Sequence, residues 1–334
     1  MKKSKQLVIG ASGFLGSHVT RQLVQAGHDV RVLIRKTSDT RGIDDLAVEC
    51  RYGDVFDDAA LREAMQGCEV VFYCVVDTRA WLRDPAPLFR TNVEGLRHAL
   101  DAALSANLKR FVFTSTIGTI ARRPGAQATE EDPFNWSELG GAYIRSRVDA
   151  ENLVLRYSRE QVLPAVAMCV ANTYGPGDWA PTPHGGFVAA AALGKLPVYV
   201  SGIRAEAVGI EDAAQALILA ADKGRIGERY IVSECFADTR EILETAADEA
   251  GARRARFAVP LPALYGIGAI GSVMAKVLHR DILLTVQAVR LMQVMTAMDH
   301  GKAQRELGWH PRPVLEAVRR AARFYLEQSR KTAT

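Results

Sequence analysis

The stretch "LVIGASGFLGSHV", residues 7–19, decides the fold of this chain. It places Gly10, Gly13 and Gly16 at three-residue spacing between a short apolar run and an amphipathic segment that ends at Gly27. Glycines at this spacing allow a tight turn and let the backbone approach a pyrophosphate, which then lies at the N-terminus of the following helix. Because the motif follows the first apolar run of the chain, it predicts a dinucleotide-binding β-α-β unit.

Short apolar runs alternate with amphipathic stretches through the first half of the chain. The predicted strands include "DVRVLIR", "EVVFYCVV", "KRFVFTST" and "LPAVAMCVA", and the predicted helices include 88–106 and 143–160. This alternation indicates a doubly wound parallel sheet of the Rossmann type. After Gly175 the rhythm changes to a Gly/Pro-rich loop, two short strands and a mostly helical C-terminal part.

We therefore expect an α/β fold with two domains, for which 334 residues provide ample length. Residues 1–178 form the dinucleotide-binding Rossmann domain, and 207–236 return to it. Residues 179–206 and 237–330 form a smaller, mostly helical substrate-binding domain.

Composition excludes several classes of protein. The apolar content of 48% and charged content of 24% are ordinary for a soluble globular protein. The net charge of +4 is spread along the chain, so no nucleic-acid partner is predicted. The five cysteines include no C-x-x-C pair and the histidines form no ligand-spaced cluster. Neither a disulfide framework nor a metal site is predicted, and a cytoplasmic location fits.

The longest apolar stretch runs from Ala263 to Ala275 and contains thirteen residues. A helix needs ~20 such residues to cross a bilayer, so no transmembrane segment is predicted. We interpret the stretch as a helix of the substrate-binding region, with contact to a membrane surface as the alternative.

The end of the second predicted strand bears on the choice of dinucleotide. An acidic residue there would bind the ribose hydroxyls of NAD, whereas a basic residue accommodates the 2′-phosphate of NADP. The sequence has Arg35 and Lys36 at this point, with Ser38 close behind and no carboxylate. It therefore favours NADP (NADPH) over NAD as the cofactor.

The stretch "GGAYIRSRVDAENLV", residues 140–154, places Tyr143 four residues before Arg147, on one face of a helix. A phenol with a pKa near ~10 exchanges protons poorly at pH 7 unless a nearby cation lowers that pKa. We expect Arg147 to hold the pKa of Tyr143 below its free value. Tyr143 would then serve as the acid in a reduction or the base in an oxidation.

Several stretches together resemble the extended short-chain dehydrogenase/reductase family. "GASGFLG" matches its glycine motif, "FTSTIGT" the segment that supplies a catalytic serine or threonine, and "AYIRSRVDAE" its Y-x-x-x-K helix. "GDVFD" matches the segment whose aspartate contacts the adenine, and "ANTYGPGD" the loop after the sixth strand. Within the family the chain is most similar to the dihydroflavonol-reductase-like branch and to hopanoid-associated sugar epimerases, through "LFRTNVEGLRHAL", "GRIGERYIV" and "KAQRELGWHPRP".

The resemblance implies a homodimeric NAD(P)-dependent enzyme that acts on a small molecule, with Thr116, Tyr143 and Arg147 as catalytic residues. Residues around the glycine motif and at the ends of later strands would bind the cofactor: Gly10, Ser12, Gly13, Phe14, Leu15, Gly16, Arg35, Lys36, Ser38, Asp54, Val55, Cys74, Val75, Val76, Thr114, Tyr143, Arg147, Val170, Asn172 and Thr173. Four residues in nearby loops would contact the substrate: Arg79, Trp81, Trp179 and His184.

The sequence also departs from the family pattern. Arg147 replaces the family lysine, Val75 and Val76 replace small residues, and Val170 replaces a proline. Nucleotide-sugar epimerases carry an R-D-Y/F-V-H-V-x-D stretch whose arginine grips the substrate phosphate. Here the corresponding stretch reads "AEAVGIED", without that arginine or the histidine.

These observations favour an NADP-dependent oxidoreductase that acts on a carbonyl or alcohol of a small, fairly apolar molecule. One alternative is a nucleotide-sugar epimerase or dehydratase. A second alternative is an NADP-binding regulatory protein whose catalysis is impaired because Arg147 replaces the lysine.

Overall fold

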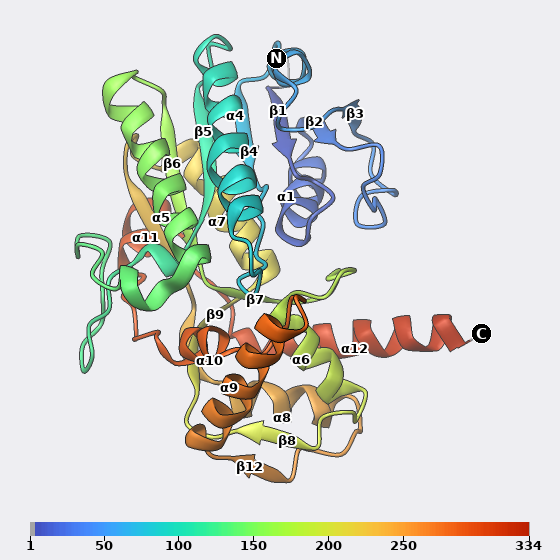
Figure 1. Cartoon of the computed structure of the whole chain (residues 1–334). Helices are drawn as coiled ribbons and strands as arrows, with labels where there is room; N and C mark the ends of the chain where they lie inside the picture. Colours follow the sequence, from blue (N-terminus) through green and yellow to red (C-terminus); the bar gives the residue numbers. More distant parts are fainter. Residues whose placement is uncertain (1–3, 334) are drawn as a thin grey trace.

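The computed structural model describes residues 4–333 and contains a seven-stranded parallel sheet in the order β10-β6-β5-β4-β1-β2-β3 (Figure 1). The strand order reverses beside β1, which is the arrangement of a doubly wound sheet. The predicted Rossmann fold class is thus confirmed. The strands are β1 (Lys5–Ile9), β2 (Asp29–Ile34), β3 (Glu49–Tyr52), β4 (Val70–Tyr73), β5 (Arg110–Thr116), β6 (Ala165–Val170) and β10 (Arg229–Val232).

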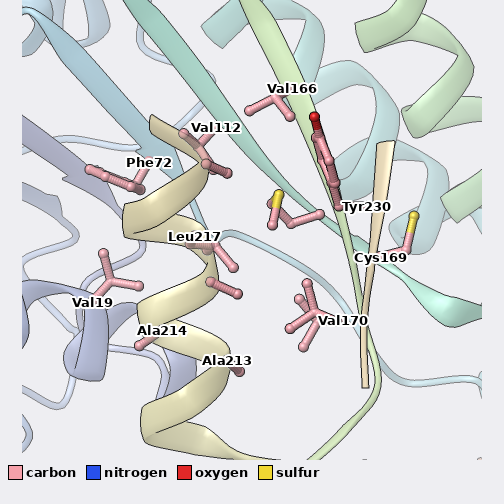
Figure 2. Close-up of a cluster of buried hydrophobic side chains, with 14 of the residues drawn as sticks. Val19, Phe72, Val112, Val166, Cys169, Val170, Ala213, Ala214, Leu217 and Tyr230 are labelled. Carbon is pink, nitrogen blue, oxygen red and sulfur yellow. The ribbon is translucent and has the colours of Figure 1, made fainter. Parts of the chain in front are cut away.

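Helices cover both faces of this sheet, so its central strands are apolar on both sides. On one face α7 packs against α1 and the strands, and Figure 2 shows Val19, Phe72, Val112 and Leu217 meeting in this buried layer. On the other face α2, α4 and α5 enclose a second buried cluster. The bounds are α1 (Phe14–Gln25), α7 (Ile210–Lys223), α11 (Gly301–Leu307), α2 (Asp58–Met65), α4 (Gly95–Leu104) and α5 (Ser137–Glu160).

Two elements differ from the sequence expectation. The edge strand β3 has the sequence ECRY and alternates between half-buried and exposed residues, so no apolar run reveals it. The predicted helix 88–106 is built from α3 (Ala86–Phe89), a π-helical turn (Arg90–Glu94) and α4. Such π-turns often mark functional sites.

The remaining elements lie beyond the carboxyl ends of the main strands (Figure 1). A small sheet has the order β11-β9-β7, and β12 pairs with β8. Helices α6, α8 and α12 share a buried cluster, and α9 packs on α10. The bounds are β7 (Asn172–Tyr174), α6 (Pro183–Ala192), β8 (Val198–Val200), β9 (Arg204–Gly209), β11 (Cys235–Asp238), α8 (Thr239–Glu249), β12 (Phe257–Val259), α9 (Leu261–Val277), α10 (Val286–Gln293) and α12 (Val314–Ala333).

Candidate active site

The glycine loop joins β1 to α1 in a turn that only glycines allow. Gly10 has a φ of +86°, in the left-handed region, and its N–H donates to the carbonyl of Leu33 on β2 at 3.4 Å. A Cβ atom on Gly16 would lie 2.2 Å from the carbonyl oxygen of Gly10. A side chain at position 16 would therefore push α1 away from β1.

The first turn of α1 can hold an anion. The helix begins after Gly13, and the backbone amides of Phe14, Leu15 and Gly16 have no acceptor within the helix. These N–H groups and the positive end of the helix dipole both favour a phosphate. Ser12, which is half-buried, precedes them. The loop therefore fits the pyrophosphate of a dinucleotide.

The cations at the end of β2 are available to a ligand. A turn forms here, in which the N–H of Ser38 donates to the carbonyl of Arg35 at 2.9 Å and the N–H of Arg35 donates to the Ser38 hydroxyl at 3.2 Å. The side chains of Arg35 and Lys36 are exposed, and within residues 4–333 neither forms an ion pair. Both can therefore meet a phosphate from solvent.

The carboxyl ends of β4 and β5 lie beside the glycine loop. The N–H of Cys74 donates to the carbonyl of Ile9 at 2.9 Å, and the Thr114 hydroxyl lies 3.5 Å from the Cys74 sulfur. A Cβ atom on Gly10 would lie 3.0 Å from Val75. The other predicted cofactor residues also follow or end strands: Asp54 and Val55 after β3, exposed Val76 after β4, buried Val170 at the end of β6, and half-buried Asn172 and Thr173 in β7.

Tyr143 lies just after a kink in α5. Gly141 adopts a φ of +65°, and the side-chain amide of Gln287 in α10 donates to the carbonyl of Leu139 at 2.8 Å. The helix resumes at the next residue and presents Tyr143, whose ring is partly buried. The phenol oxygen makes no hydrogen bond to another residue of the described part of the chain, so it is free to meet a substrate.

Arg147 is buried between α5 and β5, with only 1% of its surface exposed. Its Nη2 donates to the carbonyl of Thr114 at 2.5 Å, and its Cζ lies 5.2 Å from the centre of the Phe113 ring. Its Nε and Nη1 are buried and have no partner within residues 4–333. Buried N–H groups of a cation are costly to leave unpaired, and the ribose hydroxyls of a dinucleotide are suitable acceptors. Arg147 therefore fits the cofactor-binding role that the resemblance implies.

The expectation that the pKa of Tyr143 lies below its free value is wrong, although the Arg147 charge lowers that pKa as expected. Burial raises the pKa of the Tyr143 phenol above its ordinary value of 10, and the Arg147 charge offsets only part of that rise. The nearby carboxylate of Asp77 raises the pKa further. Helical spacing alone could not show this, because it gives the distance to the cation and not the loss of water around the phenol. Tyr143 is therefore protonated at neutral pH.

Asn92 is a buried residue that connects two parts of this site and that the sequence analysis did not identify. Asn92, in the π-helical turn, donates from Nδ2 to the carbonyl of Asp77 and to the hydroxyl of Ser146, both at 3.0 Å. Its Oδ1 accepts from the N–H of Asp77 at 2.8 Å, and the Ser146 hydroxyl donates to the carbonyl of Tyr143 at 2.7 Å. Asn92 thus fixes the loop after β4 to the turn of α5 that carries Tyr143. The stretch "LFRTNVEGLRHAL" contains it, but only as part of the family likeness.

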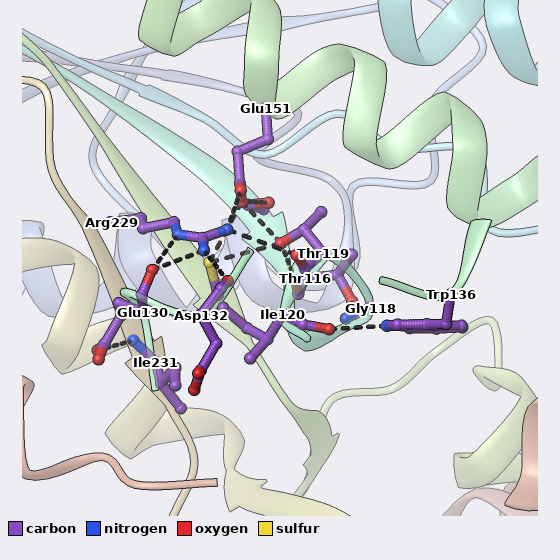
Figure 3. Close-up of polar contacts among 12 residues, drawn as sticks. Thr116, Gly118, Thr119, Ile120, Glu130, Asp132, Trp136, Glu151, Arg229 and Ile231 are labelled. Carbon is purple, nitrogen blue, oxygen red and sulfur yellow. Dashed lines mark hydrogen bonds and ion pairs between the residues drawn. The ribbon is translucent and has the colours of Figure 1, made fainter. Parts of the chain in front are cut away.

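Thr116 is the last residue of β5, and the turn that follows it packs against α5. Its Oγ1 accepts from the N–H of Gly118 at 3.2 Å, and a Cβ atom on Gly118 would lie 2.6 Å from Ile144, the residue after Tyr143. Figure 3 shows Glu151 of α5 in contact with the segment after Thr116, where its carboxylate accepts from the Thr119 hydroxyl at 2.8 Å. These contacts fix the position of Thr116.

The structure places the four predicted substrate residues in different surroundings. Arg79 forms an ion pair of 2.5 Å with Asp77, whose charge acts on Tyr143, and half-buried Trp81 lies on the same loop. His184 packs on Tyr174, and burial lowers its pKa to about 4, so its ring is neutral.

Trp179 lies in a separate hollow of about 790 Å³ and packs edge-on against Phe324 at 4.9 Å. Trp179 is the only predicted site residue that lines this hollow, which runs along α1. The structure does not bring it to Tyr143, and its role in substrate binding stays a prediction.

Apolar side chains of α10 pack near Tyr143. Tyr143, Leu291 of α10 and Met295 just after it are partly buried and pack against one buried cluster, which consists of Trp136, Ile144 and Val294. Sequence analysis did not identify this neighbourhood, because α10 is 143 or more residues away from Tyr143 in the chain. The cluster gives the surroundings of Tyr143 an apolar character.

A glycine loop that fits a pyrophosphate, together with a tyrosine and a cation beside it on one helix, defines a dinucleotide-dependent enzyme of the Rossmann type. Comparison with known proteins agrees: residues 6–233 match the model of the NAD dependent epimerase/dehydratase family. The chain belongs to this family, and it is an enzyme of the extended short-chain dehydrogenase/reductase type.

Similar proteins include reductases. "Sterol demethylase protein B" of Methylococcus capsulatus is 29% identical over 96% of this chain and 98% of its own length. A 4-hydroxy-2-methyl-3-oxo-4-farnesyl-3,4-dihydroquinoline-1-oxide ketoreductase of Stigmatella aurantiaca is 28% identical over 95% and 96%. Plant dihydroflavonol 4-reductases also match. The crystal structure of gox2253 has a TM-score of 0.86 and 32% identity, and covers 98% of this chain and 99% of its own.

Proposed function

We propose that this protein is an NADP-dependent reductase that reduces a carbonyl group of a small, fairly apolar molecule. The proposal rests mainly on one observation, the protonated and unpaired state of the Tyr143 phenol. This phenol forms no hydrogen bond with another residue of 4–333, burial raises its pKa and so keeps it protonated, and it lies on α5, which packs against β5 and against the apolar side chains of α10. A protonated, unengaged phenol at this place is suited to donate a proton to a substrate oxygen.

The residues of the chain then have separate tasks. NADPH, when bound at the glycine loop, supplies the hydride. Tyr143 donates its proton to the carbonyl oxygen as negative charge develops there. Because Oγ1 of Thr116 already accepts from the N–H of Gly118, its own hydroxyl proton is free to be donated to the same oxygen. Arg147 holds the ribose through its unpaired N–H groups and limits the rise in the pKa of Tyr143.

An apolar substrate is supported by the surroundings of Tyr143 and by the names of the relatives. Leu291 and Met295 pack against the same buried cluster as Tyr143, and such apolar surroundings suit a hydrocarbon ring or chain. The relatives are named for a sterol, a farnesylated quinoline oxide and dihydroflavonols, all of which are largely apolar.

A sugar-nucleotide substrate receives less support. Arg204, the cation nearest to the position of the epimerase phosphate-gripping arginine, donates from Nη2 to the carbonyl of Phe236 at 2.6 Å and lies 4.7 Å from the centre of its ring. Next to it, Glu206 accepts from the N–H of Met298 at 2.7 Å and is buried. Arg204 is thus turned towards Phe236, and Glu206 brings an acidic group to the stretch where the epimerases have a phosphate-binding arginine. A thermal-shift assay with UDP- and dTDP-sugars would reveal an epimerase by a clear stabilisation, which we do not expect.

We expect NADPH to bind at least ~10-fold more tightly than NADH, because one charge-assisted phosphate contact contributes about 1.5–3 kcal/mol. Arg35→Ala should remove most of this preference and leave NADH binding unchanged, since the guanidinium is exposed and makes no ion pair within residues 4–333. Fluorescence titration of both nucleotides measures the effect. Equal affinities in the unaltered protein would contradict the NADP assignment.

The raised pKa of Tyr143 predicts the pH dependence of the reaction. Reduction needs the protonated phenol, so kcat for reduction should stay level through neutral pH and fall only above the ordinary tyrosine value of 10. Oxidation of the product alcohol needs the phenolate, so its rate should rise over the same range. Rate profiles in both directions test this. A fall in the reduction rate between roughly pH 7 and 8 would show a lowered pKa instead.

A further inference from the structure

One helix of the C-terminal part presents an apolar face to solvent. Along α9, side chains at spacings of three and four residues are between 46% and 71% exposed. Residues at this spacing lie on one side of a helix. They form what we term the α9 stripe, and its members are Ile267, Ile270, Val273, Met274 and Val277.

The opposite side of α9 is fixed to the protein. Gly268 and Gly271 let the segment 282–289 approach so closely that a Cβ atom on Gly271 would lie 2.1 Å from the carbonyl of Leu284. The hydroxyl of Ser272 accepts from the N–H of Val286 at 3.1 Å. These contacts attach α9 firmly to the protein, so loose attachment does not explain why the stripe faces solvent. A helix that is apolar on both sides normally has both sides covered.

The charged residues that precede the stripe in the sequence and lie within α9 are all basic. Residues 250–280 contain no aspartate or glutamate, and the first carboxylate after them, Asp281, accepts from the N–H of Arg83 at 3.0 Å. Five cations occur before and after the apolar part of α9, and only one of them, Arg254, forms an ion pair with another described residue. The other four are Arg253, Arg256, Lys276 and Arg280. An apolar helical face with free cations at its ends complements an anionic lipid surface.

We infer that the α9 stripe docks this protein onto an anionic lipid bilayer, with α9 lying in the plane of the interface. The helix would lie on the membrane and not span it: within residues 4–333 no helix has both the length and the apolar character to cross a bilayer. The stripe would enter the boundary between headgroups and acyl chains, while Lys276 and Arg280 contact lipid phosphates.

Sedimentation with vesicles tests the inference on the full chain and needs no turnover, so its result is independent of the proposed reaction. We expect the protein to sediment with vesicles of phosphatidylcholine and phosphatidylglycerol, and much less with phosphatidylcholine alone. The double substitution Ile270→Glu/Val277→Glu should weaken binding at least ~10-fold, because it removes apolar burial and adds two like charges. Lys276→Gln and Arg280→Gln should each cost ~fivefold at low salt.

Ile226→Glu is the matched control, because Ile226 is 56% exposed and lies outside α9, just before β10. It should bind vesicles like the unaltered protein. Equal binding by the Ile270→Glu/Val277→Glu variant, or no binding of the unaltered protein to either vesicle, would overturn the inference. Sedimentation velocity tests whether a second copy of this chain binds the stripe instead. A dimer that the same double variant dissociates would assign the stripe to that second copy and overturn the inference.

Discussion

Tyr143→Phe is expected to lower kcat for carbonyl reduction by ~100- to 10,000-fold while NADPH affinity stays within about twofold of the original. The substitution removes only the phenol oxygen, which makes no hydrogen bond within the described residues, so neither packing nor the glycine loop should change. Steady-state rates and nucleotide titration on the same preparation measure both quantities. Unchanged turnover in this variant would mean that Tyr143 is not the proton donor.

Tyr73→Phe provides the matched control for this experiment. The Tyr73 hydroxyl is also buried without a partner among residues 4–333, but it lies within the sheet core, packed on Phe111 at 6.1 Å. Its removal should leave turnover unchanged and should not lower the free energy of unfolding, because an unsatisfied buried hydroxyl is lost. A large fall in turnover with Tyr73→Phe would show that the site responds to any loss of a phenol.

Gly16→Ala is expected to weaken NADPH binding at least ~100-fold. The new Cβ atom would lie 2.2 Å from the carbonyl of Gly10, so either α1 or the turn after β1 must move. Such a shift would displace the first-turn amides, and the loss of two charge-assisted contacts of about 1.5–3 kcal/mol each accounts for the factor. We also expect the clash to lower the free energy of unfolding by about 1–3 kcal/mol.

Gly186→Ala controls for the effect of adding a methyl group. Gly186 lies in α6, and a Cβ atom there would have no neighbour within 4 Å. NADPH affinity should be unchanged, and the free energy of unfolding should rise by about 0.5–1 kcal/mol because alanine favours a helix. If Gly16→Ala binds NADPH as well as Gly186→Ala does, the loop does not hold the pyrophosphate.

The parts of the molecule that sequence could predict depend on local patterns. The glycine spacing of residues 10–16 and the apolar runs of the main strands are properties of short segments, and the structure has them where expected. The family motifs similarly placed Thr116 and Tyr143 on β5 and α5, which pack together.

What the sequence could not show depends on contacts between distant segments. Asn92 joins the loop after β4 to α5 through partners 15 and 54 residues away, and Leu291 of α10 packs against the same buried cluster as Tyr143. The pKa of Tyr143 is raised because the phenol is buried by the fold, and the helical spacing of Tyr143 and Arg147 does not show that burial. Trp179 occurs in the expected loop, but the fold turns its ring towards Phe324.

The most direct test of the proposed reaction is a turnover assay with NADPH and a panel of apolar ketones that includes steroid, flavonoid and prenylated compounds. We predict that at least one ketone is converted to its alcohol, with one NADPH consumed for each molecule of product. Tight NADPH binding with no conversion of any ketone, or conversion of a sugar nucleotide without net consumption of the nucleotide cofactor, would contradict it.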